Sequence, residues 1–143
     1  MKRFGRMVAV MLLFSILPLT TAAFAEVKII VDKSTQTLRV YEDGSALYTW
    51  DVSTGKKDSW TPNGNFGVQS MNANHFSSRY NNAPMPWSVF FNGNVAIHGT
   101  TAVRMLGNRD SHGCVRLHPQ NAEKLYRLIQ EHGPKAVTIK VQS

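Results

Sequence analysis

Cysteine is almost absent from this chain, which has a single one, Cys114, among its 143 residues. An internal disulfide is therefore impossible, and the paired Cys-x-x-Cys pattern of structural zinc sites is missing. No internal repeat, low-complexity segment or linker interrupts the sequence. Length and composition predict one domain with a single core. Taken without its neighbours, a lone cysteine is most often a small buried apolar residue.

Long hydrophobic runs are absent too, because no apolar stretch reaches the roughly 20 residues of a membrane-spanning helix. The longest run covers residues 7–19 and is interrupted only by Ser15 and Pro18. Three positive charges precede it, and an Ala-Phe-Ala cleavage pattern follows at residues 23–25. We interpret residues 1–25 as a signal peptide and expect an exported mature chain, residues 26–143. An uncleaved membrane anchor is the alternative. A lipoprotein is excluded because the residue directly after the cleavage pattern is Glu26 and not a cysteine.

Acidic residues are scarce, with 9 Asp and Glu against 16 Lys and Arg and a formal net charge of +7. The predicted signal carries three of the positive charges, which leaves +4 for residues 26–143. Basic residues in that part of the chain are scattered, and Lys56-Lys57 is their only pair. We therefore expect no nucleic-acid partner. The charge fits either an ordinary solvated face or a weak attraction to polyanionic surfaces.

Alternation of apolar and polar residues indicates a mainly β fold. Strands are expected at residues 27–32, 37–41, 46–53, 66–71, 87–91, 94–98 and 136–141. Asp43-Gly44 and Asn92-Gly93 are the hairpin signals between them. Polar residues predict loops at 55–65 and 72–86, and the second of these is a candidate lid.

One helix is expected over residues 119–132. Pro119 suits its first turn, an apolar stripe with helical spacing follows, and Gly133-Pro134 ends it. The sum is an antiparallel or mixed β domain with one helix after the cysteine.

The most informative run is Ser111-His112-Gly113-Cys114-Val115-Arg116-Leu117, with His98 sixteen positions before the cysteine. A thiol attacks as its thiolate, and an imidazole that takes the proton and stays beside the sulfur as a cation favours that form. His98 is the preferred base because it ends a predicted strand, whereas His112 is too close in sequence to face the thiol. Gly113 permits a tight turn whose backbone N–H groups can converge on an oxyanion.

Zinc binding is the competing interpretation of the same residues, because four side chains could ligate a metal: His98, His112, Cys114 and His118. Their spacing lacks the paired pattern of structural sites. His118 abuts Pro119 and is interpreted as a residue of the helix start. His75 and His132 are interpreted as surface residues.

These residues resemble the catalytic domain of the L,D-transpeptidases of bacterial cell walls. The matching stretches are Ile97-His98-Gly99-Thr100, the run from Ser111 to Leu117, Thr61-Pro62-Asn63-Gly64-Asn65-Phe66, Met85-Pro86-Trp87 and the first hairpin. The resemblance covers nearly all of residues 27–141, and the cysteine motif is its most specific part. Asn65 stands where the family more often has Thr. The resemblance implies a β-sandwich-like domain, residues 26–143, with one principal helix after the cysteine motif.

The resemblance also implies a reaction on peptidoglycan stem peptides, with no cofactor and no metal. Cys114 would attack the carbonyl of the third residue, a diamino acid, and expel the terminal D-alanine. An amine of a neighbouring stem, or of a wall-anchored protein, would then take the acyl group. Family roles place His98 as base, the Gly99 carbonyl as its orienting group, and the backbone N–H groups of His112, Gly113 and Cys114 as oxyanion donors. Location in the periplasm or cell wall and reaction with carbapenems are implied as well.

Four further residues are substrate-binding candidates under this resemblance: Ser111, Arg116, Met85 and Trp87. Ser111 and Arg116 match motif residues that hold the loop or bind a substrate carboxylate, but Arg116 could instead pair with Asp110. For Trp87, a place in the core is the preferred interpretation. Water in place of the amine would make the protein an L,D-carboxypeptidase or endopeptidase. A non-catalytic wall-binding or metal-binding module is the third alternative.

Overall fold

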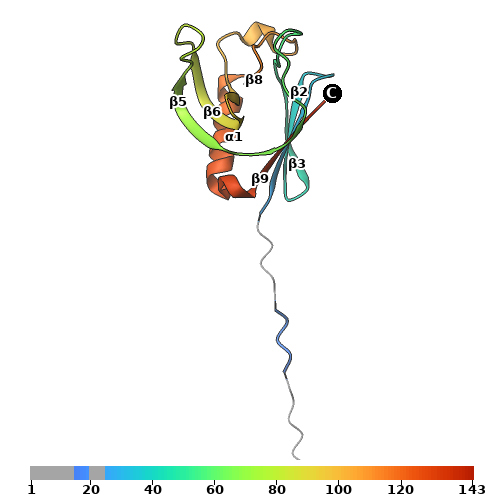
Figure 1. Cartoon of the computed structure of the whole chain (residues 1–143). Coiled ribbons are helices and arrows are strands. Elements are labelled where there is room, and N and C mark those ends of the chain that lie inside the picture. Colours follow the sequence, from blue (N-terminus) through green and yellow to red (C-terminus); the bar gives the residue numbers. More distant parts are fainter. Residues whose placement is uncertain (1–14, 20–24) are drawn as a thin grey trace, which may run out of the picture.

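The computed structural model describes residues 15–19 and 25–143. The predicted signal peptide, residues 1–25, therefore lies almost wholly outside the described residues. No helix in the described part of the chain is long and apolar enough to cross a membrane. Within the same residues, nine strands form two sheets, and the principal helix follows the cysteine motif (Figure 1). The expectation of a mainly β fold with one main helix is confirmed.

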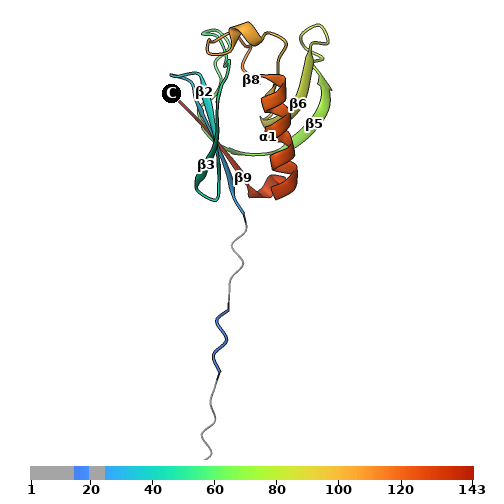
Figure 2. The ribbon, with the colours of Figure 1, turned by 180° about the vertical axis from the view of Figure 1, so that it is seen from behind.

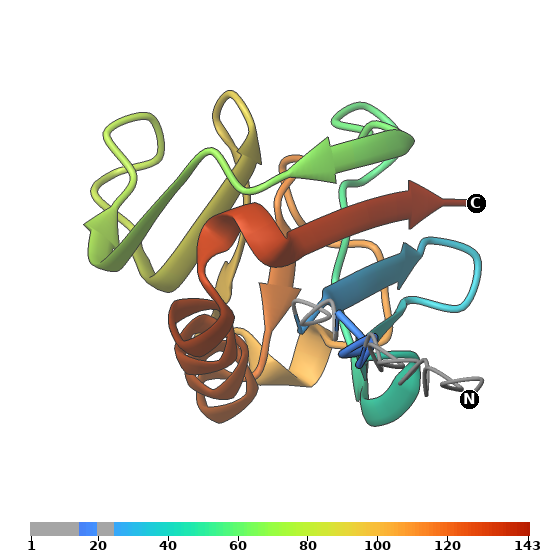
Figure 3. The ribbon, with the colours of Figure 1, turned by 90° about the horizontal axis from the view of Figure 1, so that it is seen from below.

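The first sheet has five strands in the order β3-β2-β1-β9-β4. They are β3 (Ser45–Asp51), β2 (Thr37–Glu42), β1 (Val27–Asp32), β9 (Val137–Gln142) and β4 (Gly64–Gly67). The pairing of β1 with β9 is parallel and the others are antiparallel. The first and last strands of the domain are therefore neighbours at the centre of one sheet, as Figure 3 shows from below.

The second sheet has four strands in the order β5-β6-β7-β8. They are β5 (Ser70–Phe76), β6 (Pro84–Asn92), β7 (Val95–Gly99) and β8 (Val115–Leu117). Here β7 and β8 run parallel, so the segment between them must cross back, and it contains the short 3-10 helix η1 (Val103–Met105). This crossing segment also carries the start of the cysteine motif.

Helix α1 (Pro119–His132) has the bounds that the sequence predicts. His118 caps its first turn by accepting a hydrogen bond from the Gln120 backbone N–H, and Gly133 ends it with φ 84°. Its buried stripe packs against β6 and β7 (Figure 2) and is formed by Ala122, Leu125, Tyr126 and Ile129. A second 3-10 helix, η2 (Pro134–Ala136), leads from α1 into β9.

Apolar side chains from both sheets and from α1 form one core. Alternate residues of β1 and β9 enter it, which is why those strands are apolar at every second position. The turn between β2 and β3 places Asp43 at φ 49° and Gly44 at φ 82°, the conformation that a two-residue hairpin turn requires.

Two predicted segments differ from the structure. The expected strand 66–71 is divided between β4 and β5, which belong to different sheets. The expected loop 72–86 is mostly a hairpin, because β5 extends to Phe76 and β6 begins at Pro84, leaving only residues 77–83 as its loop. Every second residue of β5 is exposed, so the strand is held chiefly by its pairing with β6 and lacks a strong apolar pattern.

Candidate active site

Strand pairing brings the two predicted reacting residues to one face of the second sheet. In the parallel pair β7 and β8, Ile97 lies opposite Val115 and His98 opposite Arg116. Ile97 and Val115 point into the core. Because side chains alternate along a strand, His98 and Arg116 point to the other face, and Cys114, one residue before β8, does so too. All three line the same pocket.

His98 is buried, with 6% of its surface exposed. Its Nδ1 lies 2.7 Å from the carbonyl oxygen of Gly99. A carbonyl can only accept, so Nδ1 carries the hydrogen in this contact and Nε2 is left as a proton acceptor. Burial lowers the His98 pKa to about 4, and the Gly99 contact offsets this only in part. His98 is therefore a neutral imidazole in the tautomer that a general base needs.

Gly99 has a packing role beside its carbonyl. A Cβ at this position would lie 3.0 Å from Pro86 Cγ and 3.2 Å from Pro119 Cα. Glycine therefore lets the end of β7 pack closely between β6 and the start of α1, which fixes the imidazole.

Cys114 is half-buried, forms no disulfide, and has its Sγ 3.6 Å from the carbonyl oxygen of Asn94. Burial raises the pKa of this thiol. A backbone hydrogen bond from Ala96 and the nearby Arg116 charge act in the opposite direction. Burial thus disfavours both charges of a thiolate–imidazolium pair, and proton transfer during attack on a carbonyl avoids forming that pair beforehand.

Ser111 organises the loop that precedes the cysteine. Its hydroxyl donates to the Cys114 carbonyl oxygen at 2.5 Å and accepts from the Gly113 N–H at 3.1 Å. Gly113 has φ 125°, a conformation that favours glycine. In this structure the Gly113 N–H, expected as an oxyanion donor, is already bonded to Ser111. The N–H groups of His112 and Cys114 have no partner among the residues that the structure describes.

A second loop, residues 55–61, lies against the cysteine loop. The Thr61 hydroxyl donates to the Gly113 carbonyl oxygen at 2.7 Å and accepts from the Gly55 N–H at 2.9 Å. The Lys56 N–H donates to the Ser111 carbonyl oxygen at 3.0 Å. Thr61 lies in one of the stretches that resemble the family, and the resemblance assigns it no role. Its contact with Gly113 spans 52 residues of sequence, so no local pattern reveals it.

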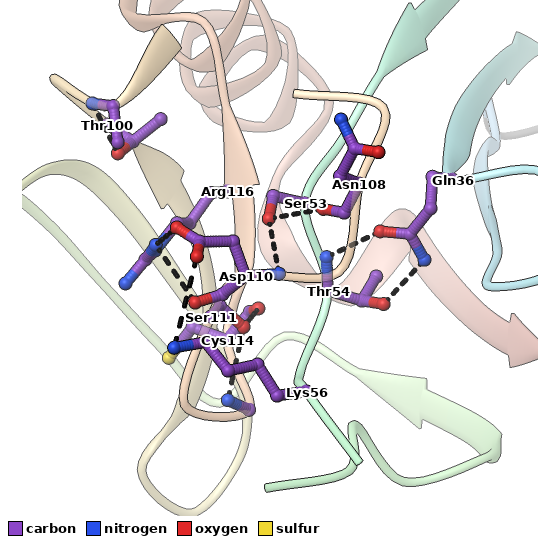
Figure 4. A network of polar contacts seen from close by, with 12 residues as sticks. Gln36, Ser53, Thr54, Lys56, Thr100, Asn108, Asp110, Ser111, Cys114 and Arg116 are labelled. Carbon is purple, nitrogen blue, oxygen red and sulfur yellow. Dashed lines mark hydrogen bonds and ion pairs between the residues drawn. The ribbon is translucent and has the colours of Figure 1, made fainter. Parts of the chain in front are cut away.

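Arg116 lies in a polar network beside the pocket (Figure 4). Its Nη1 is 3.0 Å from Asp110 Oδ2, and Lys56 Nζ is 3.9 Å from Asp110 Oδ1. The Arg116 backbone also exchanges two hydrogen bonds with Ser53. Pairing with Asp110, which the sequence left as an alternative, is therefore present, while Arg116 still lines the pocket. The pairing with Asp110 engages Nη1 of the guanidinium.

The pocket has a volume of about 810 Å³, within the usual range for small-molecule sites. Met85 lines it, as expected, together with Ser111, His112 and Gly113. The 77–83 loop forms one wall, where the Tyr80 ring stacks on His112 with centroids 4.5 Å apart. His75 also lines the pocket, against the edge of Phe90, although the sequence placed it on the surface.

Trp87 is not among the residues that line this pocket, which speaks against its candidate substrate role and agrees with its interpretation as a core residue. Its ring lies 5.4 Å from that of Tyr126, and the Arg127 guanidinium lies 5.3 Å from it. The cause is local, because Trp87 has φ 57°, which interrupts the alternation along β6 and turns the side chain towards α1. Trp87 belongs to the packing of the helix.

The four histidine and cysteine side chains considered for zinc have separate contacts. His118 caps α1 and His112 stacks on Tyr80, away from the His98 contact with Gly99. Among residues 15–19 and 25–143 there is no group of three or more His, Cys, Asp or Glu side chains that could hold a metal ion.

Comparison with known proteins gives consistent matches. A family model of the L,D-transpeptidase catalytic domain, YkuD, matches residues 26–139. YqjB of Bacillus subtilis, assigned by its name to the L,D-transpeptidases, is 31% identical over 114 residues, covering 71% of this chain and 65% of that protein.

Two solved structures extend the likeness to the fold. An L,D-transpeptidase from Mycobacterium smegmatis matches with a TM-score of 0.74 and 26% identity, over 83% of this chain and 59% of that one. One from Stackebrandtia nassauensis matches with a TM-score of 0.71 and 30% identity, over 85% and 57%. This chain spans less than two thirds of the length of each of the three relatives.

Proposed function

Because this chain belongs to the L,D-transpeptidase catalytic domain family, we propose that it transfers acyl groups between peptidoglycan stem peptides with Cys114 as nucleophile. One observation carries the proposal. Cys114 and His98 line the same pocket, and the Gly99 carbonyl holds His98 in the tautomer that leaves Nε2 free to accept a proton. That arrangement is what a thiol and its general base require.

In the first half-reaction, Sγ attacks the carbonyl carbon of the diamino acid while its proton passes to His98 Nε2. The developing oxyanion is placed to accept hydrogen bonds from the two free N–H groups, those of His112 and Cys114. The tetrahedral intermediate then breaks its C–N bond. The imidazolium returns the proton to the departing amine, so that D-alanine leaves and a thioester remains on Cys114.

In the second half-reaction, an acceptor amine attacks the thioester carbonyl and gives its proton to His98. The C–S bond breaks, and the proton returns to the sulfur. The product is a new amide, the 3–3 cross-link when the amine belongs to a neighbouring stem. Water follows the same route to a free carboxylate, so a carboxypeptidase differs from a transpeptidase only in the nucleophile that reaches the thioester.

We also propose that the protein acts outside the cytoplasm, in the periplasm or cell wall. The support is the pattern of residues 1–25, which has the charge, apolar run and cleavage sequence of a signal peptide. The substrate, a wall polymer, lies in the same compartment.

The proposal is tested by intact-mass spectrometry of the purified protein. Incubation with a carbapenem should add one β-lactam mass, and incubation with a tetrapeptide substrate and a diamino acceptor should give a cross-linked product. Both results should be lost in Cys114→Ala. An adduct accompanied only by the tripeptide product would assign hydrolysis. No adduct and no turnover on folded, reduced protein would contradict the proposal.

A further inference from the structure

The two free N–H groups of the cysteine loop share a feature, which a parallel β-bridge between Gly55 and Ser111 explains for only one of them. Each belongs to a peptide whose carbonyl is held by the loop formed by residues 55–61. The Ser111 carbonyl, in the peptide that carries the His112 N–H, accepts from the Lys56 N–H at 3.0 Å. The Gly113 carbonyl, in the peptide that carries the Cys114 N–H, accepts from the Thr61 hydroxyl at 2.7 Å.

Peptide planarity turns these contacts into a direction. In a trans peptide the C=O and the N–H point to opposite sides of the chain. A carbonyl fixed towards the 55–61 loop therefore fixes its partner N–H to point away from that loop. A hydrogen bond accepted by the carbonyl also polarises the same peptide, which makes its N–H a stronger donor.

The 55–61 loop is itself braced from the first sheet by Lys33. This side chain is completely buried, and its Nζ donates to the Thr61 carbonyl oxygen at 2.7 Å. Nζ also lies 4.1 Å from the centre of the Trp60 ring. No carboxylate lies within 4.0 Å of Nζ in the described residues, so these contacts compensate its burial. The Lys33 ammonium group therefore fixes the position of the Thr61 carbonyl.

The two ends of the 55–61 loop pack closely against each other. Gly55 donates its N–H to the Thr61 hydroxyl, and a Cβ on Gly55 would lie 1.8 Å from the Ser59 carbonyl oxygen. The hydroxyl therefore sits in one place, with a donor on one side and the Gly113 carbonyl on the other. Both Thr61 and Gly55 are buried, so these hydrogen bonds are shielded from bulk solvent.

From these contacts we propose that Thr61 is a positioning residue of the reaction. Its hydroxyl holds the Gly113–Cys114 peptide so that the Cys114 N–H faces the oxyanion, and Lys33 holds Thr61. This inference rests on the proposed function, because it assumes that a carbonyl is attacked at Cys114. It makes no claim about the thiol or its base, so its consequences can be separated from theirs.

The test compares Thr61→Val, which keeps the shape and loses the hydroxyl, with Thr61→Ser, which keeps the hydroxyl. Acyl transfer forms an oxyanion, whereas alkylation of the thiol by iodoacetamide does not. Removing an oxyanion donor costs about 10²- to 10³-fold in kcat. For a misaligned donor we expect Thr61→Val to lower kcat for acyl transfer roughly 10- to 100-fold, with iodoacetamide alkylation and its pH profile unchanged and KM nearly so. Thr61→Ser should restore most of the rate.

Lys33→Met should act in the same direction with a smaller loss. Combined with Thr61→Val it should add little, because both substitutions release the same peptide. Thr138→Val, on the exposed side of β9, is the matched control and should leave both reactions unchanged. Circular dichroism and thermal unfolding establish that each variant is folded before its rates are compared.

A third measurement does not depend on turnover. A carbonyl that accepts a hydrogen bond deshields the N–H of its own peptide, so the amide proton of Cys114 should move upfield in Thr61→Val and stay in place in Thr61→Ser. The proposal is overturned if folded Thr61→Val transfers acyl groups within twofold of the wild type. It is also overturned if alkylation falls in parallel with acyl transfer, or if the Cys114 amide does not shift. A wild-type protein that is alkylated but never acylated would reject the proposed function, and the amide shift would still decide the role of Thr61.

Discussion

At the scale of single residues, burial sets the chemistry of this site. His98 is buried and Cys114 half-buried, and this burial lowers the pKa of the imidazole and raises that of the thiol. The two shifts move the pair away from the ionised form and towards the neutral form. This direction favours a proton transfer that accompanies attack over a thiolate formed beforehand.

The acid limb of the pH–rate profile follows from this arrangement. His98 accepts a proton only when unprotonated, and its pKa is about 4 instead of 6.5. As pH falls, kcat/KM for acyl transfer should therefore stay constant down to about pH 5 and halve near pH 4. His98→Asn should lower the rate roughly 10²- to 10⁴-fold.

The control for this prediction is His132→Asn. His132 lies far from the pocket, paired with Glu42 Oε2 at 2.7 Å, and its loss should leave the limb in place. A limb near pH 6.5 in the wild type would show instead that the imidazole is solvated.

At the scale of elements, the hairpin of β5 and β6 carries its loop over the cysteine motif. Tyr80, in the 77–83 loop, stacks on His112 across the pocket with the ring planes 15° apart. The stack joins a wall of the pocket to the loop that bears the nucleophile. It holds residues 77–83 against the cysteine loop without touching the reacting atoms.

Removal of this ring should weaken substrate binding more than catalysis. An aromatic pair contributes about 0.5–1.5 kcal/mol, so Tyr80→Ala should raise KM about twofold to tenfold with a smaller change in kcat. Tyr80→Phe keeps the stack and should behave as the wild type.

The matched control is Phe76→Ala. Phe76 is an exposed aromatic residue of the same hairpin that does not line the pocket. A tenfold loss of kcat in Tyr80→Ala at unchanged KM would contradict the role assigned to the stack.

The elements also show which features the sequence could specify. Helix α1 could be predicted because Pro119 and Gly133 mark its ends and its apolar residues recur with helical spacing. The sequence could also predict that His98 and Cys114 share one site, because both belong to specific motifs of a known family, and both line the same pocket. The extent of strand β5 could not be predicted, because its own residues lack a strong apolar pattern. Its pairing with β6, across the 77–83 loop, stabilises it.

Residue types left Trp87 divided between the core and the substrate and gave Thr61 no role, for two different reasons. A positive φ at Trp87 turns its side chain out of the strand's alternation, and no sequence pattern around it predicts that φ. Thr61 acts through a contact with a backbone carbonyl far away in sequence, and such an acceptor leaves no trace in residue type.

At the scale of the whole molecule, the start of β1 is tied to the turn between β2 and β3. The Glu26 N–H donates to Asp43 Oδ1 at 2.8 Å, and the Asp43 N–H donates to the Glu26 carbonyl oxygen at 2.9 Å. Glu26 is the first residue of the proposed mature chain. Cleavage after Ala25 would replace this neutral N–H by an α-ammonium group facing the same carboxylate, so that export itself would create an ion pair in the folded domain.

This link between processing and stability gives a measurable prediction for the chain of residues 26–143. Asp43→Asn should lower its free energy of unfolding by about 0.5 kcal/mol at pH 6, the usual scale of an exposed ion pair. The difference should fade above about pH 8, where an α-amino group loses its proton, and should also fade in high salt. Asparagine tolerates the positive φ of this turn, so backbone strain does not contribute. Urea unfolding measures the change, with Asp51→Asn as the exposed control. Asp43→Asn in a chain that keeps residues 1–25 should have a smaller effect, because the Glu26 nitrogen is then an uncharged amide. Equal effects in the two chains would mean that the hydrogen bond alone acts and that cleavage adds no stability.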